Sequence, residues 1–285
     1  MANLRDIRRR IDSVKSTQQI TKAMKMVAAS RLRRAQDSIL ASRPYALKML
    51  EVLSSLALRT NPNAHPLLVT RDPKKVELLV ITSDRGLCGA FNSSILRSAE
   101  RFMAEHPEWE FSLNIVGRKG MDFFKRRNIK TRKVSVNILA DVSVPIAAAI
   151  GESLVEGYLT EEFDQVYMVY NEFKSAIQQR VVVEQLLPIK PMDISEDTFI
   201  VEYTYEPSED AILEELLPRH VNIQVFRSLL ESAASEHGAR MTAMDAASKN
   251  ASDMIDKLTL LYNRQRQAAI TKELMEVVSG AEALT

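Results

Sequence analysis

The sequence predicts a mixed α/β fold, with a long antiparallel coiled coil formed by N- and C-terminal helices plus a central Rossmann-like α/β domain. Three observations support this prediction. Apolar and small residues recur every seven positions near both ends, β-rich runs alternate with helical stretches between them, and only 8 of 285 residues are glycine. Heptad rows offset by three and four are typical of coiled coils, and alternating strands and helices favour a largely parallel sheet.

Residues 1–60 are predicted to form one long helix. Pro44 removes a backbone hydrogen bond and usually kinks a helix, but the heptad phase continues across it, so we expect a bend and not an end. The run Asn61–Pro66 then ends the segment. The two rows are Leu4, Ile11, Gln18, Lys25, Leu32, Ile39, Ala46 and Leu53, and Ile7, Val14, Thr21, Ala28, Ala35, Ser42, Met49 and Leu56.

Residues 208–285 are predicted to be helical again. Ser208 can cap the first turn, and Pro218 predicts a short helix before a long one that runs from Arg219 to about Ser279. The middle layers of both terminal segments are small or polar and bury little apolar area, which favours a coiled coil enclosed by partners. The rows here are Ile223, Leu230, His237, Met244, Ala251 and Leu258, and Phe226, Ala233, Arg240, Ala247, Met254, Leu261, Ala268 and Met275.

Residues 70–205 form the predicted central domain. The last three β-rich runs have no long helices between them, so we expect an antiparallel edge there. The predicted strands are 76–82, 111–116, 134–139, 165–171, 179–188 and 199–205, and the predicted helices are 93–105, 119–127 and 146–163.

Charge is concentrated near the N-terminus. Residues 1–43 hold eleven Lys or Arg and three acidic residues, a local charge of +8, whereas the whole chain carries +1. A basic helix needs an anionic partner or a solvated face. Because the segment has almost no aromatic residues and no nucleic-acid-binding motif, we expect no nucleic-acid partner.

Targeting and redox signals are sparse. No run of about 18 apolar residues predicts a membrane span, and the first residues lack the apolar stretch of a secretory signal. The Arg-rich start leaves a mitochondrial transit peptide as an alternative, although the heptads begin at Leu4. Cys88 is the only cysteine, so an intrachain disulfide is excluded and a reducing cytoplasm fits.

The turn Ser83–Gly89 follows a predicted strand and precedes a helix, where α/β folds bind phosphates. It matches neither common phosphate-binding glycine motif. Three interpretations stay open: a tight turn that needs glycine, a protruding contact pair made by Asp84 and Arg85, and an anion site. The four histidines show no metal-ligand spacing, and His237 falls on the helical seam, where a packing or interface role is expected.

The stretch 261–274 crowds amide and guanidinium groups onto a helix that has outrun its partner. In an antiparallel pair, the N-terminal helix begins near residue 3 and so has few residues left to pack against 261–274. We therefore expect these residues to face another protein, with Arg and Gln side chains hydrogen-bonding its loops.

Four blocks of sequence resemble the γ subunit of F-type ATP synthases, of the bacterial type. The resemblance covers the whole chain in order, and four matching blocks at the right separations are specific. The blocks are Ile20–Ser30, Ser83–Gly89, Ala234–Met244 and Tyr262–Leu274.

The resemblance implies a central-stalk rotor. In that family the coiled coil turns inside a ring of α and β subunits, and the α/β domain with an ε subunit rides on a membrane ring of c subunits. Transmembrane proton (or sodium-ion) flow turns the stalk and drives ATP synthesis at sites on other chains. The resemblance therefore implies no catalytic, cofactor-binding or metal residue, and a peripheral location at the cytoplasmic face of the cell membrane.

The family's contact residues carry over position by position. Met24 and its neighbours match the place where the shaft passes an acidic β-subunit lever loop, and Lys25 departs from the Glu that many relatives carry. Arg266, Gln267 and Thr271 match an upper β-subunit contact. Asp84 and Arg85 match a loop that meets neighbouring subunits. The expected contact residues are Lys22, Met24, Lys25, Asp84, Arg85, Arg266, Gln267 and Thr271.

Two other functions remain as alternatives. The chain could be a stand-alone α/β enzyme that binds an anion or phosphate at the Ser83–Gly89 turn. It could also be a homodimeric adaptor whose coiled coil forms between two copies.

Overall fold

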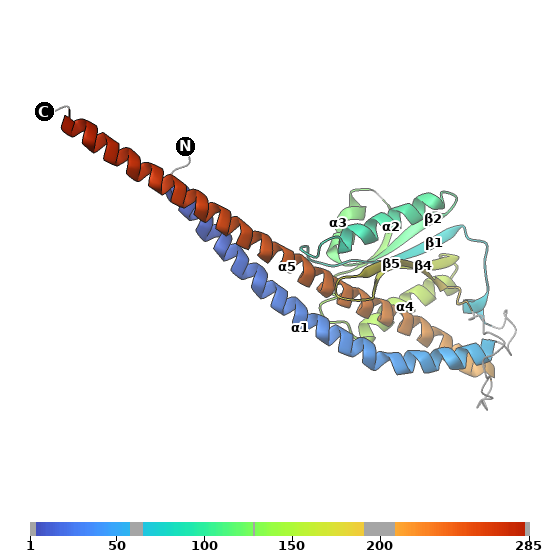
Figure 1. The fold of residues 1–285 in the computed structure, drawn as a ribbon. Coiled ribbons are helices and arrows are strands. Elements are labelled where there is room, and N and C mark those ends of the chain that lie inside the picture. The colour runs from blue at the N-terminus through green and yellow to red at the C-terminus, as the bar shows by residue number, and fades with distance from the viewer. Residues whose placement is uncertain (1–3, 58–64, 128, 191–208, 283–285) are drawn as a thin grey trace. The chain divides into compact units, whose positions relative to one another are not determined.

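A computed structural model describes residues 4–57, 65–127, 129–190 and 209–282 (Figure 1). Along the sequence, one long helix near each end of the chain flanks a region of alternating strands and helices. The elements are α1 (Leu4–Ala57), η1 (Pro66–Leu68), β1 (Lys75–Ile81), α2 (Phe91–Glu105), β2 (Glu110–Val116), α3 (Arg118–Lys125), β3 (Thr131–Ser135), α4 (Val144–Leu159), β4 (Gln165–Phe173), β5 (Gln179–Leu187) and α5 (Glu209–Glu282).

The chain divides into two compact units. The first comprises Met1–Ala28 with Met241–Thr285, and the second comprises Ala29–Arg240. Helices α1 and α5 each contribute to both units. In the second unit their pieces run antiparallel, since Arg31 lies near His237 while Tyr45 lines a cavity with Arg219.

The sheet has five strands in the order β3-β2-β1-β4-β5. Pairing is parallel throughout, except that β5 runs antiparallel to β4. This confirms the predicted parallel sheet with an antiparallel edge. Six of the seven residues of β1 are buried, as expected of a central strand covered on both faces.

One strand lies earlier than predicted. The sequence predicts a strand over residues 134–139, whereas β3 spans Thr131–Ser135. Asn137 then adopts a left-handed conformation with φ 62°, and its N–H donates to Asp84 Oδ2 at 2.9 Å. That turn ends the strand although valine and isoleucine continue the β-rich run. The predicted strand 199–205 lies outside the described residues.

The sheet is covered by helices on both faces (Figure 1). On one face, Tyr167 of β4 packs against Phe102 of α2, and Gly120 of α3 approaches Ile115. On the other face, α5 meets β4 and β5 through Arg227, which binds Glu184. The hydrophobic core therefore lies in two layers, one on each face of the sheet. The layer on the α5 face attaches residues 213–233 of α5 to the sheet.

A buried charge pair ties α4 to the middle of the sheet. Glu77 on β1 is fully buried, and Arg132 Nε on β3 donates to its Oε1 at 2.9 Å. Ser112 donates a hydrogen bond to the other oxygen of this carboxylate, and Arg132 also reaches Ser153 of α4. Such a pair is tolerated because every charged atom has a partner.

The burial pattern of α1 confirms its predicted heptad rows. From Leu4 to Ser42, each predicted row position is buried or half-buried. On α5 the row from Ile223 to Leu258 is confirmed as well, but its companion row holds only as far as Ala247. Beyond that residue the half-buried positions come one residue later, and Met254 and Leu261 are exposed. A straight helix of 3.6 residues per turn drifts against a seven-residue repeat, which accounts for the shift.

Both Pro44 and Pro218 lie inside a helix without ending it. Pro44 lies inside α1, as predicted, and α1 is visibly bent (Figure 1). The predicted break at Pro218 is wrong, because α5 continues through it as one helix of 74 residues. Leu217 and Val221 beside it are fully buried in the core. Their burial offsets the hydrogen bond that proline removes.

Among the described residues, no helix combines the length and the apolar character that crossing a membrane requires.

Gly117, which links β2 to α3, provides a test of the packing. It has φ 93°, and a Cβ there would lie 2.0 Å from the Thr82 carbonyl oxygen. We expect Gly117→Ala to lower the free energy of unfolding by about 2–4 kcal/mol in urea denaturation, through steric overlap and backbone strain.

Gly86→Ala is the matched control, since a Cβ there would meet only Lys119 Cε at 3.9 Å. Its effect should stay within about 0.5 kcal/mol. Equal losses in the two variants would contradict the described geometry around Thr82.

Candidate functional site

The predicted contact residues are divided between the two units. Lys22, Met24 and Lys25 on α1, with Arg266, Gln267 and Thr271 on α5, belong to the first unit, and Asp84 and Arg85 belong to the second. Each group is described below by itself.

Lys25 is held by a partner within the chain. Its Nζ lies 2.6 Å from Asp245 Oδ1, and this hydrogen bond, followed by that from Lys249, lowers the pKa of the Asp245 carboxyl below its ordinary value. Lys22 is exposed and Met24 is half-buried. The face around Met24 therefore offers Lys22 to solvent, while the charge of Lys25 is balanced by α5.

The C-terminal contact residues lie on an uncovered helix. Arg266, Gln267 and Thr271 are exposed, and the Thr271 hydroxyl donates to the Gln267 carbonyl at 2.9 Å. Every residue from Ile270 to Ser279 is exposed as well. This confirms that α5 runs on without cover among the described residues, as its amide- and guanidinium-rich sequence suggested.

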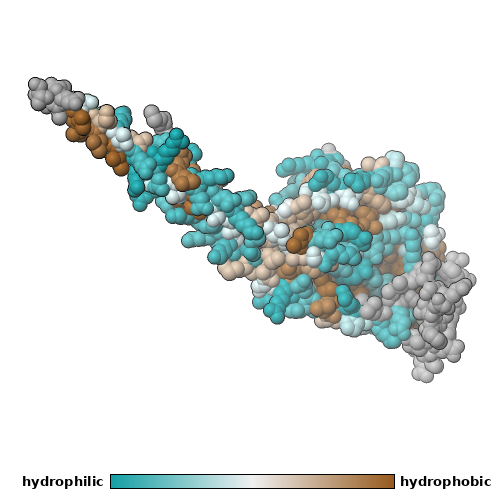
Figure 2. Space-filling model, in the orientation of Figure 1, coloured by the Kyte–Doolittle hydropathy of each residue, from teal (hydrophilic) through white to brown (hydrophobic). Residues whose placement is uncertain are grey.

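Sequence analysis missed the apolar character of this end of α5. Leu274 is 60% exposed, Val277 is 72% exposed, and Ile270, Met275 and Val278 are also exposed. Figure 2 shows these hydrophobic side chains gathered toward the C-terminal end of the helix. Contiguous exposed apolar surface marks an interaction site. The signal was present in the sequence, since Leu274–Met275 and Val277–Val278 break the polar pattern of a solvated helix.

Asp84 is used inside the fold. Its carboxylate accepts hydrogen bonds from the backbone N–H groups of Arg118 at 3.1 Å and Asn137 at 2.9 Å. It therefore links the Ser83–Gly89 turn to the start of α3 and to the loop after β3. Arg85 is exposed, so only the guanidinium of the predicted pair is free to reach another molecule.

The polar groups of the Ser83–Gly89 turn bond to each other. Ser83 N–H donates to Asn92 Oδ1 at 3.0 Å, and Ser83 Oγ donates to the Arg85 carbonyl at 2.6 Å. Asn92 Nδ2 in turn donates to Cys88 Sγ at 3.2 Å. These bonds hold Ser83, Arg85, Cys88 and Asn92 together, which supports the tight-turn interpretation.

Cys88 is buried inside this turn. Burial raises the pKa of its thiol, and the hydrogen bond with Ser83 and the charge of Arg240 oppose that shift only in part. A thiol whose pKa is raised is mostly protonated at neutral pH, and the thiolate is the nucleophile. Burial and a raised pKa both favour a packing role for Cys88 over a nucleophilic one.

Arg240 on α5 joins the same turn and was assigned from sequence only to the seam. Its guanidinium donates to the Gly86 carbonyl at 3.3 Å and to Glu236 Oε1 at 2.7 Å. Both side chains are nearly buried, and burial raises the pKa of Glu236 although Arg240 opposes the shift. The i, i+4 spacing of the Glu and the Arg was the available signal.

His237 lies beside that pair and is buried, in keeping with the packing role expected from its seam position. Burial, and then the charges of Arg240 and Arg31, lower the pKa of its imidazole to about 4. Its Nδ1 has no hydrogen-bond partner among the described residues. The histidine is therefore neutral near pH 7.

Comparison with known proteins gives matches over the length of the chain. A family model described as ATP synthase matches residues 3–284. The ATP synthase gamma chain of Geobacter sp. strain M21 is 56% identical over the whole of this chain and 99% of that protein. The gamma chain of Anaeromyxobacter sp. strain Fw109-5 is 54% identical over the full length of both.

Solved structures give the same result for the fold. A chain from the central stalk and c-ring structure of the Tetrahymena thermophila mitochondrial ATP synthase is 33% identical. It aligns with a TM-score of 0.62 over 80% of this chain and 99% of that chain. A chain from the Euglena gracilis mitochondrial ATP synthase rotor, 22% identical, has a TM-score of 0.68 over 94% and 98% of the two chains, which supports the fold.

The lowered pKa of His237 predicts a pH dependence of stability. The ordinary histidine pKa is 6.5 and the folded value is about 4, so the unfolded chain binds a proton first as pH falls. Stability should therefore decline between about pH 6.5 and pH 4. His237→Gln should reduce that slope by up to about 1.4 kcal/mol per pH unit in urea titrations.

The free energies of unfolding of the variant and the parent chain are first compared at pH 8, where His237 is neutral in both the folded and the unfolded state. The difference at pH 8 measures any general effect of the substitution. Identical slopes for the variant and the parent chain would contradict a buried neutral histidine at this position.

Proposed function

The chain belongs to the ATP synthase gamma-chain family, and from this premise we propose that it is the central-stalk rotor subunit of an F-type ATP synthase. In this role it couples transmembrane proton flow to ATP synthesis or hydrolysis by rotation. The observation that carries the proposal is the full-length match to proteins named ATP synthase gamma chain.

The proposed partners are the α and β subunits of the surrounding ring, the ε subunit and the membrane c-ring. The uncovered end of α5 supports a partner around the helix, because its exposed apolar side chains would be buried by an enclosing surface. The basic first 43 residues suit an acidic partner. The chain would thus be peripheral, at the cytoplasmic face of the cell membrane.

A non-catalytic role fits the chemistry of the described side chains. The Ser83–Gly89 turn is closed by its own hydrogen bonds, and Cys88 is buried with a raised pKa. We propose that the chain breaks no bonds itself and that torque passes through packed and charged surfaces, as in other rigid-body transitions. The bond-breaking sites would lie on the ring.

Each of the three predicted segments has a part in this proposal. Residues 1–60 and 208–285 would form the shaft, and residues 70–205 would form the domain that meets ε and the c-ring. The hydrogen bonds that Arg227 donates to Glu184, at 2.7 and 3.0 Å, fasten α5 to the edge strand β5. That contact would let the domain turn the lower shaft without slipping.

The proposed contact residues divide by what they can offer. Lys22, Arg85 and Arg266 present exposed cations, and Gln267 and Thr271 present hydrogen-bonding groups. Met24 offers a half-buried apolar contact. Asp84 and Lys25 would act chiefly by shaping the surface, because both are bonded within the chain.

Co-expression tests the proposed function. The full-length chain should co-purify with the α and β subunits of the same organism, and the resulting complex should hydrolyse ATP, while the chain alone should not. A chain that remains monomeric and separate from α and β, or that hydrolyses ATP alone, would refute the proposal. A homodimer in sedimentation of the isolated chain would favour the adaptor alternative.

The upper contact can be tested by Arg266→Ala combined with Gln267→Ala. Because both side chains are exposed, the fold should be unchanged in circular dichroism. We expect association with α and β to weaken by about tenfold, or about 1.4 kcal/mol, and ATP synthesis in membranes to fall.

Lys257→Ala is the control, an exposed cation on the same helix that precedes the stretch 261–274. Unaltered assembly and ATP synthesis in the double variant would count against the proposed contact. So would an equal loss in the control.

A further inference from the structure

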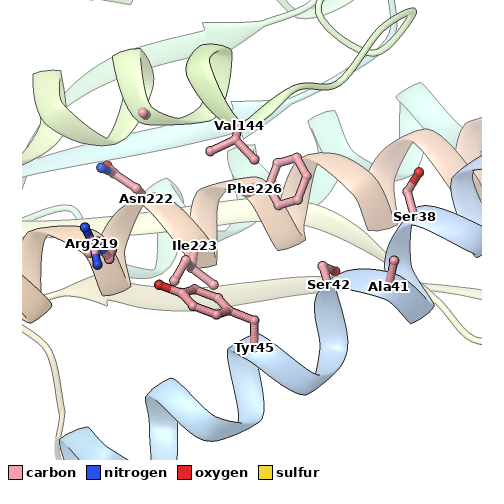
Figure 3. A pocket seen from close by; sticks show the side chains of 10 residues that line it. Ser38, Ala41, Ser42, Tyr45, Val144, Arg219, Asn222, Ile223 and Phe226 are labelled. Carbon is pink, nitrogen blue, oxygen red and sulfur yellow. The ribbon is translucent and has the colours of Figure 1, made fainter.

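A cavity of about 660 Å³ lies in the second unit between α1, α4 and α5. Figure 3 shows its side chains converging from the three helices, with Tyr45 from α1, Val144 from α4, and Ile223 and Phe226 from α5. All of these residues belong to 29–240, the unit that also holds the sheet. A volume of this size is in the usual range of small-molecule sites.

A proline in α1 and small side chains on the cavity wall account for the cavity. Pro44 lies inside α1, which is bent, and a proline kink prevents the helix from following its partner evenly. The α1 residues on the cavity wall, Ser38, Ala41 and Ser42, are small, and Ala148 on α4 is small too. The hollow thus follows from a helix bend combined with short side chains.

The opposite wall is fixed at a second point. Gly151 on α4 lets Asn222 of α5 come close, since a Cβ at position 151 would lie 2.1 Å from Asn222 Oδ1. This close approach sets the distance between α4 and α5, and Ala148 and Asn222 both line the cavity. Helices α4 and α5 are therefore already in close contact at Gly151, beside the cavity.

Large apolar side chains around the cavity remain in contact with water. Val144 is 61% exposed and Tyr45 is 53% exposed. Together with Ile223 and Phe226 they form a wall that an apolar molecule would cover. Burying such surface is favourable at about 25 cal/mol per Å².

Charge sets a direction along the cavity. Arg219, Asn222, Ile223 and Phe226 occupy one face of α5 at spacings of three, four and seven residues. Arg219 carries a cation at one end, where the exposed carboxylate of Glu215 lies 3.2 Å from its guanidinium, and Phe226 provides an aromatic ring at the other. Seven residues of helix separate them by about 10 Å.

We propose that this cavity binds a small amphiphilic carboxylate, with its anionic end at Arg219 and its apolar body along Ile223, Phe226 and Val144. The ligand would be about 10 Å long, the size of a medium-chain fatty acid. This site is separate from the contact surfaces proposed above, and its occupancy does not depend on the rotor function.

Binding of decanoate to the full-length chain, measured by isothermal titration calorimetry below the micelle concentration, tests the proposal. We expect saturable binding of one decanoate per chain and at least tenfold weaker binding of decyltrimethylammonium, because Arg219 selects the anion. Absence of saturable binding, or preference for the cationic amphiphile, would overturn the proposal.

Variants locate the site. Arg219→Gln should weaken decanoate binding about tenfold, and Arg97→Gln, an exposed arginine of α2 outside the cavity, should leave it unchanged. Ala148→Phe and Ala41→Phe fill the cavity from opposite walls and should abolish binding with the circular dichroism spectrum retained. If both cavity-filling variants misfold, the decanoate affinities of Arg219→Gln and Arg97→Gln are compared to decide the result.

Equal binding by Arg219→Gln and the parent chain would overturn the proposal. The same titration on the chain assembled with α and β should again show binding. Loss of binding on assembly would mean that another subunit covers the cavity, and would overturn it as a ligand site of the complex.

Discussion

The structure depends on one constraint: an amphipathic helix must bury its apolar stripe against other apolar surface. Helix α5 has 74 residues and α1 has 54. From Ile7 to Met49 and from Leu213 to Ala251, buried positions recur along the two helices. From Ile270 onward α5 has no such cover among the described residues, and it is there that leucine, methionine and valine face solvent. Exposed apolar side chains of this kind are the surface that the proposed enclosing partner would bury.

In the second unit, α5 is attached to the sheet by a buried apolar stripe and, beside it, by directional hydrogen bonds. Ser235 Oγ of α5 donates to the Asn171 carbonyl at 3.2 Å, and Arg240 reaches the Gly86 carbonyl. Tyr170 donates to Glu184 at 2.7 Å, the same carboxylate that binds Arg227. Directional bonds of this kind resist sliding along the helix axis, which purely apolar contacts tolerate better. They fit a shaft that must turn with its domain.

Much of this organisation could be predicted from sequence. Heptad rows located the buried face of α1, and alternating strand and helix patterns predicted a largely parallel sheet with an antiparallel edge. The failures have local causes. Asn137 in a left-handed turn ended β3 early, burial of Leu217 and Val221 carried α5 through Pro218, and helical drift shifted the companion row after Ala247. Periodicity reports the average pattern and cannot register these tertiary effects.

Family resemblance selected the individual candidate contact residues, whereas the sequence pattern itself indicated only the stretch 261–274 and, as one of three interpretations, the pair Asp84 and Arg85. The internal roles of Asp84 and Lys25 could not be foreseen, because their partners, Asn137 and Asp245, are distant in sequence. The cavity beside Pro44 was also invisible, since it depends on three helices and on the close approach at Gly151.

The central claim is that this chain turns as a unit inside a ring of other subunits. The direct test is to assemble it with α and β, immobilise the ring, and attach a bead to a cysteine placed at exposed Lys130, with Cys88→Ser removing the native thiol. The account predicts continuous rotation of the bead in one direction while ATP is hydrolysed, and arrest when hydrolysis is inhibited. A bead that stays fixed during undiminished ATP hydrolysis, in complexes that retain the chain, would contradict it.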